Sequence, residues 1–359
     1  MTNSTTPKIC RRGFIAGSSA LILQGILDPS SLIASTSGRL TICDVLQDES
    51  LKPVHIKQIV AQEAPDLVDI IKFERDKSVA IRYGYALIDR LYADERFAQE
   101  VNSKIRDKGF IKQLVKDYSK DIRFRGKPKS EILDFIDSSQ GFFEVMDALK
   151  QKSIRDMREK VNSAPAITFS YSYDFGQGIM PRVYIFSTVY EPNDFMLGSI
   201  RRQMPATDEY VTAVVNHEAS HARIRMEKLS LDDSLVINSS NWSSVNSNVF
   251  EFVNETTCWL RAMNRLQEAT GEKKSHFPFH PVYAYLALQV LELREYYQNK
   301  LKREKLDGFS QRLAERQKEI ISRELPSQSL ARASLLFYSD PFSRYGCDQR
   351  TFKFSSGTP

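Results

Sequence analysis

The spacing of apolar residues predicts a helical N-terminal region over residues 44–160. Apolar side chains recur there at intervals of three and four residues, separated by charged ones, as in amphipathic helices with one solvated face. The repeats are Ile56, Ile59 and Val60, then Leu67, Ile70 and Ile71, with further helices predicted at 80–91, 110–118 and 130–143.

The pattern changes near Ala164 to one that is typical of strands. Residues 166–174 and 182–190 are rich in aromatic and β-branched side chains, and both show a two-residue alternation. Gly176 and Pro181 lie between them, which predicts a hairpin or a tight return.

The rest of the chain is predicted to be mostly helical. A helix over 207–228 begins at Thr207, a good N-cap, and a polar loop follows over 229–246. The next helix is capped by Ser247 or Asn248 and ends before Gly271. Further helices are predicted over 282–305 and 309–324.

Composition describes an ordinary globular protein. The chain has 359 residues, 42% hydrophobic and 26% charged, which fits two domains or one large domain. No apolar run reaches the roughly 18–20 residues of a membrane span, so no transmembrane segment is expected in the mature chain. The net charge of +5 is a mild excess, and no nucleic-acid partner is expected from it.

The N-terminal residues 1–37 have the three parts of an export signal. Arg11 and Arg12 precede an apolar stretch from Phe14 to about Leu27, and small residues follow near 34–37. The arginine pair resembles a twin-arginine signal, with Cys10 at a position where Ser or Thr is usual. The resemblance implies export to the periplasm or beyond, or, alternatively, a membrane anchor formed by an uncleaved signal.

The four cysteines form no metal-binding pair. Cys10 lies in the export signal, so an odd number remains, and a bridge between Cys43 and Cys347 is one option in an oxidising compartment. Cys258 is expected to be a buried packing residue rather than a metal ligand.

Residues 217–221 read HExxH within the helix predicted for 207–228. His217 and His221 project from one helix face, so both imidazoles can reach one Zn²⁺. Glu218 is offset by about 100° and can take a proton from an attacking water and deliver it to a leaving amine. This combination indicates a zinc-dependent hydrolase.

The motif and the order of elements around it resemble the zincin metallopeptidases over about residues 166–270. The resemblance implies that the HExxH helix packs beneath a small sheet whose edge strand, here 182–190, holds a peptide or protein substrate. It also implies one Zn²⁺ per chain, peptide hydrolysis through a zinc-activated water, and Glu218 as the catalytic residue.

Two arrangements of the third ligand fit less well. The metzincin pattern requires glycine and histidine where this chain has Ile224 and Glu227. Asp232 or Asp233 would give an aspartate ligand on the loop that follows the helix.

Two acids on the following helix are better placed. Glu251 and Glu255 share a helix face, 30 and 34 residues after His221. This resembles the gluzincin arrangement, and Asn254-Glu255 resembles the Asn-Glu pair of thermolysin-like enzymes, although Trp259 stands where those enzymes have an acid. Glu255 is the predicted third ligand. Glu251 is the alternative ligand, or a carboxylate that orients the site from behind.

The remaining histidines and nearby tyrosines are weaker candidates. His276, His280 and Tyr283 could stabilise the oxyanion of the reaction, and Tyr285 is an equal candidate. His55 is expected to be structural.

We therefore expect an exported, mostly α-helical α+β protein. Its parts are the export signal over 1–37, the helical N-terminal region over 44–160, a zincin-like catalytic domain over 164–325 and a C-terminal tail over 326–359. The expected function is that of a zinc metallopeptidase. The alternatives are a zinc-binding protein or non-peptidase hydrolase, and a helical binding scaffold with an accidental HExxH.

Overall fold

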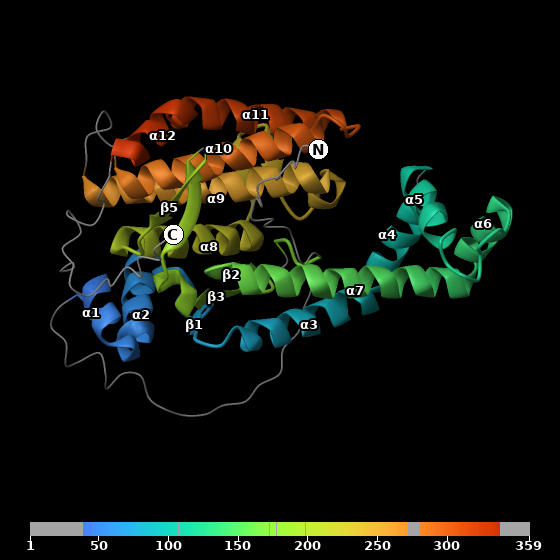
Figure 1. Ribbon diagram of the computed structural model, residues 1–359, viewed down its shortest axis with the longest axis horizontal. Coiled ribbons are helices and arrows are strands. Elements are labelled where there is room, and N and C mark those ends of the chain that lie inside the picture. Colours follow the sequence, from blue (N-terminus) through green and yellow to red (C-terminus); the bar gives the residue numbers. More distant parts are fainter. Residues whose placement is uncertain are drawn as a thin grey trace. The chain divides into compact units, whose positions relative to one another are not determined.

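The computed structural model describes residues 39–106, 108–171, 173–176, 178–197, 199–271 and 280–337 (Figure 1). This part of the chain is mostly helical with small sheets, which confirms the expected mostly α-helical α+β class. It divides into two compact units. Unit 1 contains Lys77–Ser163 with Phe169–Ser172, and unit 2 contains the residues up to Asp76, Ala164–Thr168 and the chain from Tyr173.

The helices of unit 1 are α3 Lys77–Ala93, α4 Glu95–Ile105, α5 Lys108–Tyr118, α6 Lys129–Asp137 and α7 Ser139–Ser163. Helices α3 and α7 lie side by side (Figure 1). They run antiparallel, since Lys77 Nζ donates to the Asn162 carbonyl at 2.8 Å. Gly84 permits the close approach, because a Cβ there would lie 2.6 Å from Met157 Sδ.

The helix predicted over 130–143 is two helices in the structure. Ser138 is extended between α6 and α7, and its hydroxyl accepts a hydrogen bond from Gly141 N at 3.1 Å. The turn is so tight that a Cβ on Gly141 would lie 1.9 Å from the Phe135 carbonyl oxygen. Periodicity continues across the break because both helices bury their apolar faces in one cluster, which includes Ile136 and Val145.

In unit 2, the helices and strands before the HExxH motif are α1 Ile42–Gln47, α2 Lys52–Glu63, β1 Ile71–Glu74, β2 Ala166–Phe169, β3 Arg182–Phe186, β4 Asn193–Leu197 and β5 Ile200–Met204. The expectation of helix at Leu67–Ile71 is wrong, since a short 3₁₀ turn precedes strand β1 there. Three apolar residues at helical spacing are too few to distinguish a helix turn from a short buried strand.

The main sheet has the strand order β1-β3-β2. Strand β3 pairs in parallel with β1, with Ile71 opposite Val183, and its end meets the start of β2 where Phe186 N donates to the Pro165 carbonyl at 2.9 Å. Strand β3 is thus central and buried, so the expectation that 182–190 forms the edge strand is wrong. Strand β2 is an edge, and the central strand β3 packs against the helix that contains HExxH.

The later elements of unit 2 are α8 Asp208–Met226, β6 Leu229–Asp232, β7 Leu235–Ile237, α9 Ser247–Thr270, α10 Pro281–Leu301, α11 Gly308–Glu324 and α12 Gln328–Phe337. The segment expected as a loop over 229–246 begins with a hairpin, because Asp232 closes a tight turn by accepting from Ser234 N. Helix α9 contacts α8, α10 and α11 (Figure 1), and its C-cap Gly271 has the left-handed φ of 62°.

Several sequence expectations fall outside the described residues. These are the export signal over 1–37, His276, Cys10 and Cys347, and the tail beyond residue 337. Cys43 is disulfide-bonded, and its expected partner Cys347 is among these residues. In the part of the chain that is described, no helix combines the length and apolar character needed to cross a bilayer.

Asp94 is the N-cap residue of helix α4, and its carboxylate also contacts other side chains. Its carboxylate accepts from Arg96 N at 2.9 Å, from Arg96 Nη2 at 2.8 Å and from the buried hydroxyl of Tyr171. The hydrogen bonds from Arg96, aided by that from Tyr171, hold the pKa of Asp94 far below its usual value. Burial and the Asp94 charge raise the pKa of Tyr171 to about 12.

We expect Asp94→Asn to destabilise unit 1 by about 1 kcal/mol at pH 7, since asparagine keeps the helix cap but removes the charge. A carboxyl group with a lowered folded-state pKa stabilises the protein above its unfolded pKa, and that stability is lost as the pH falls through the folded pKa. The difference between wild type and variant should therefore shrink below pH 3.8, the ordinary value. Urea denaturation as a function of pH measures it, and a difference that does not change with pH would contradict this account.

Candidate metal centre

Helix α8 is a core helix rather than an amphipathic surface helix. Thr207 caps it by accepting from Tyr210 N at 3.1 Å, as the sequence predicted. All residues from Tyr210 to Ala222 are buried, and the apolar ones belong to the main core cluster. The HExxH residues therefore lie in the protein interior, where polar side chains need specific partners.

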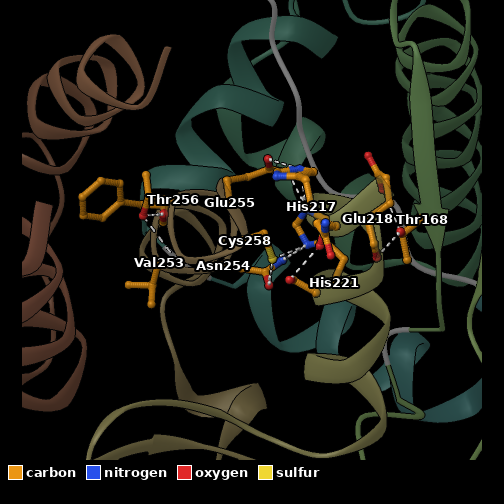
Figure 2. Close-up of polar contacts among 12 residues, drawn as sticks. Thr168, His217, Glu218, His221, Val253, Asn254, Glu255, Thr256 and Cys258 are labelled. Carbon is orange, nitrogen blue, oxygen red and sulfur yellow. Dashed lines mark hydrogen bonds and ion pairs between the residues drawn. The ribbon is translucent and has the colours of Figure 1, made fainter. Parts of the chain in front are cut away.

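Helix α9 provides an acidic partner for both histidines. His217 Nε2 and His221 Nε2 lie 3.0 Å apart, and each lies 3.6 Å from a carboxylate oxygen of Glu255 (Figure 2). Both histidines are buried, and the Glu255 side chain is 15% exposed. The structure thus brings together two histidines of α8 and a glutamate of α9 that lies 38 positions after His217 and 34 after His221.

The spacing and chemistry of this group fit a zinc ion. Tetrahedral zinc with bond lengths of about 2.0–2.2 Å to nitrogen and oxygen requires neighbouring ligand atoms about 3.3–3.5 Å apart. The separations of 3.0–3.6 Å lie close to that range, although the two histidines face different oxygens of the Glu255 carboxylate. Two imidazoles and one carboxylate leave the fourth position open, as in catalytic zinc sites.

In comparisons with protein-family models, with curated proteins and with solved structures, nothing matches this chain.

Polar groups on α9 contact His221 at Nδ1, the ring nitrogen that does not face Glu255. Its Nδ1 lies 3.0 Å from the side-chain amide of Asn254 and 3.3 Å from Cys258 Sγ (Figure 2). Burial alone would lower the pKa of His221, but Cys258 and Glu255 outweigh it and raise the pKa well above the usual value. His221 Nδ1 accepts from the Asn254 side-chain N–H when it is unprotonated and donates to Cys258 Sγ when it is protonated, and either contact fixes the ring orientation.

Cys258 lies on the side of His221 away from the metal position. Its thiol is buried, and burial raises its pKa. Cys258 is outside the group of three candidate ligands. This placement agrees with the expectation of a packing residue and adds contact with the histidine ring.

Trp259 supports the other histidine. Its indole stacks on the His217 ring, with centroids 3.8 Å apart and planes inclined by 31°. At this position an aromatic ring is packed against the imidazole. The stacked ring restricts the rotation of His217 and excludes water from its face.

Glu218 is held by a residue that sequence reasoning missed. Thr168 on strand β2 donates a hydrogen bond from Oγ1 to Glu218 Oε2 at 2.7 Å (Figure 2). The Glu218 carbonyl oxygen also lies 3.2 Å from the same hydroxyl. Glu218 is 6% exposed and does not belong to the group of three. The carboxylate of Glu218, the residue next in sequence to His217, is thus held by strand β2.

The alternative ligands have other contacts in the structure. Glu251 lies outside the group of three, and the Tyr297 hydroxyl donates to it. Asp232 closes the hairpin turn and pairs with Arg316 at 3.1 Å. Glu227 is exposed at the C-cap of α8, and Asp233 is exposed as well.

The described oxyanion candidates have structural contacts. His280 is the N-cap of α10 and accepts from Tyr283 N at 3.4 Å. The Tyr283 hydroxyl donates to the Glu324 carbonyl at 3.4 Å, and Tyr285 packs its ring against Phe195. His55, expected to be structural, is buried between Tyr190 and Asp208.

The identity of the third ligand can be tested by metal content. We expect about one zinc per wild-type chain, and a loss of affinity of more than about 100-fold for His217→Ala and for Glu255→Gln, because each removes a donor. Glu251→Gln is the matched control on the same helix face and should retain zinc. Elemental mass spectrometry after dialysis against a weak chelator measures this. If Glu251→Gln loses zinc and Glu255→Gln keeps it, the ligand assignment is reversed.

Proposed function

We propose that this protein is a zinc-dependent metallohydrolase, most specifically a metallopeptidase with a gluzincin-like site. The observation that supports it is the convergence of His217, His221 and Glu255, with the buried Glu218 beside them but outside the ligand group. A structural zinc site has no need of an additional buried carboxylate next to it, whereas a hydrolytic site does.

Each residue of this site has a separate role in the proposed hydrolysis. A bound zinc supplies Lewis acidity, which lowers the pKa of water to about 7 and polarises a carbonyl group. Glu218 accepts the proton of the attacking water and passes it to the leaving amine. Thr168 orients the Glu218 carboxylate toward that path through its hydrogen bond at 2.7 Å. Asn254 and Cys258 hold His221, and Trp259 holds His217.

The position of β2 supports a peptide as the substrate. This strand is an edge of the main sheet, and its residue Thr168 contacts the proposed base. An edge strand presents unpaired backbone groups to which an extended peptide can add as a further strand. A peptide held in this way would run past Glu218. The N-terminal signal, by its sequence, supports the further proposal that the enzyme acts outside the cytoplasm.

Substitution of the proposed base separates catalysis from metal binding. We expect Glu218→Gln to lower kcat by about 100-fold to 10,000-fold while zinc content stays near one per chain, because the amide cannot accept the proton. Peptide-library cleavage followed by mass spectrometry measures activity. Glu227→Gln, at the exposed end of the same helix, is the control and should leave cleavage unchanged.

The outcomes separate the proposal from its alternatives. Zinc without cleavage of any peptide by the wild type would favour a hydrolase of another bond or a non-catalytic zinc protein. Wild-type protein without zinc, after zinc-replete expression, would favour a helical scaffold in which HExxH is accidental.

Thr168→Val tests the positioning of Glu218. We expect kcat to fall about tenfold with zinc retained, and Thr168→Ser to restore it, because serine keeps the hydroxyl. Loss of a hydrogen bond to the charged carboxylate raises its pKa, so the acid limb of the kcat/KM profile should move to higher pH. A valine variant with the wild-type rate and profile would show that Thr168 has only a packing role.

A further inference from the structure

The positive charge of the chain is concentrated in one part of unit 1. Residues 104–129 contain ten Lys and Arg and three Asp, which gives a net charge of +7. Since the whole chain has a net charge of +5, the remainder has −2. The mild overall excess therefore conceals a strongly basic segment, which spans the end of α4, the whole of α5 and the start of α6.

Five cations of this segment are exposed and have no ion-pair partner among the described residues. They are Arg106, Lys112, Lys116, Arg125 and Lys129. Lys112 and Lys116 are one turn apart on α5, whose apolar face packs into the cluster through Leu114 and Tyr118. Their charges are thus directed to solvent, without the acidic neighbours that neutralise other cations nearby.

Large apolar side chains are exposed at the same end of unit 1. Ile122 is 82% exposed and Phe143 is 70% exposed, which are the highest values among large hydrophobic residues in the described chain. Arg123 follows Ile122 in the sequence, and Glu144 follows Phe143. The two charged side chains form a bidentate ion pair with contacts of 2.9 and 2.8 Å. We call these two side chains and the five unpaired cations the basic surface.

We propose that the basic surface binds anionic lipid bilayers. A bilayer with anionic headgroups provides what both parts of the surface require. Its surface potential attracts the five cations, and its interface accepts Ile122 and Phe143, which are costly to expose to water. A nucleic acid offers the negative charge and a stacking partner for Phe143, but it offers little to an aliphatic side chain such as Ile122.

This inference is independent of the proposed hydrolase. The basic surface lies wholly in unit 1, whereas the HExxH motif and Glu255 belong to unit 2. Binding to lipid can thus be measured whether or not the protein cleaves peptides.

Vesicle co-sedimentation with the full chain tests the proposal. The probes are vesicles of phosphatidylcholine alone and vesicles that also contain phosphatidylglycerol. We expect binding only to the second kind, decreasing as salt is added. Lys112→Glu with Lys116→Glu should weaken it at least about tenfold, and Ile122→Ser with Phe143→Ser should weaken it severalfold. Circular dichroism and zinc content show that the variants are folded.

A matched control changes the net charge by the same amount elsewhere. Lys302→Glu with Lys305→Glu alters two exposed lysines of unit 2 and should retain at least half of the wild-type binding. Equal binding to both kinds of vesicle, no binding to either, or equal loss in this control would each overturn the proposal. Binding to single-stranded DNA that depends on Lys112 and Lys116, without vesicle binding, would assign the surface to nucleic acid instead.

Discussion

The packing of α8 against α9 is the interaction on which the candidate site depends. It buries a helix whose middle holds two imidazoles and a carboxylate, and these groups are costly to remove from water. The cost is offset because α9 supplies polar partners at matching positions: Glu255 faces both histidines, and Asn254 and Cys258 face the rear of His221. Separation of the two helices would leave several buried polar groups without partners at once.

A buried carboxylate fastens the same helix pair to α2. Glu63 accepts from Arg265 Nε of α9 at 2.9 Å and from the Asn216 side-chain amide of α8 at 3.2 Å. Asn216 directly precedes His217, so this contact fixes the backbone where the motif begins. The charge of Glu63 is compensated by the Arg265 guanidinium, which a carboxylate needs at such burial. The segment 52–63 thus supports the site, although its sequence contains no motif.

Local periodicity was sufficient for the predictions that depend on one helix or on neighbouring helices. The α8 and α9 helices, the shared face of His217 and His221, and the placement of Glu255 one turn from Glu251 follow from a period of 3.6 residues. Contacts between distant segments could not be predicted in this way. Thr168 meets Glu218 across 50 positions of the chain, and nothing in its surroundings marks a threonine as the partner of an acid. Strand β1 was missed because its pairing with β3 decides its conformation, not its own short apolar run.

Because Trp259 stacks on His217, the fluorescence of its indole is linked to the state of the candidate site. The chain has two tryptophans, and the other, Trp242, packs edge-on against Tyr173. Only Trp259 has its ring against an imidazole of the candidate site, at 3.8 Å. The excited indole is sensitive to the electronic state of a ring in such contact, so proton or metal at His217 changes its emission. The protein therefore contains an intrinsic fluorophore in direct contact with a residue of the candidate metal centre.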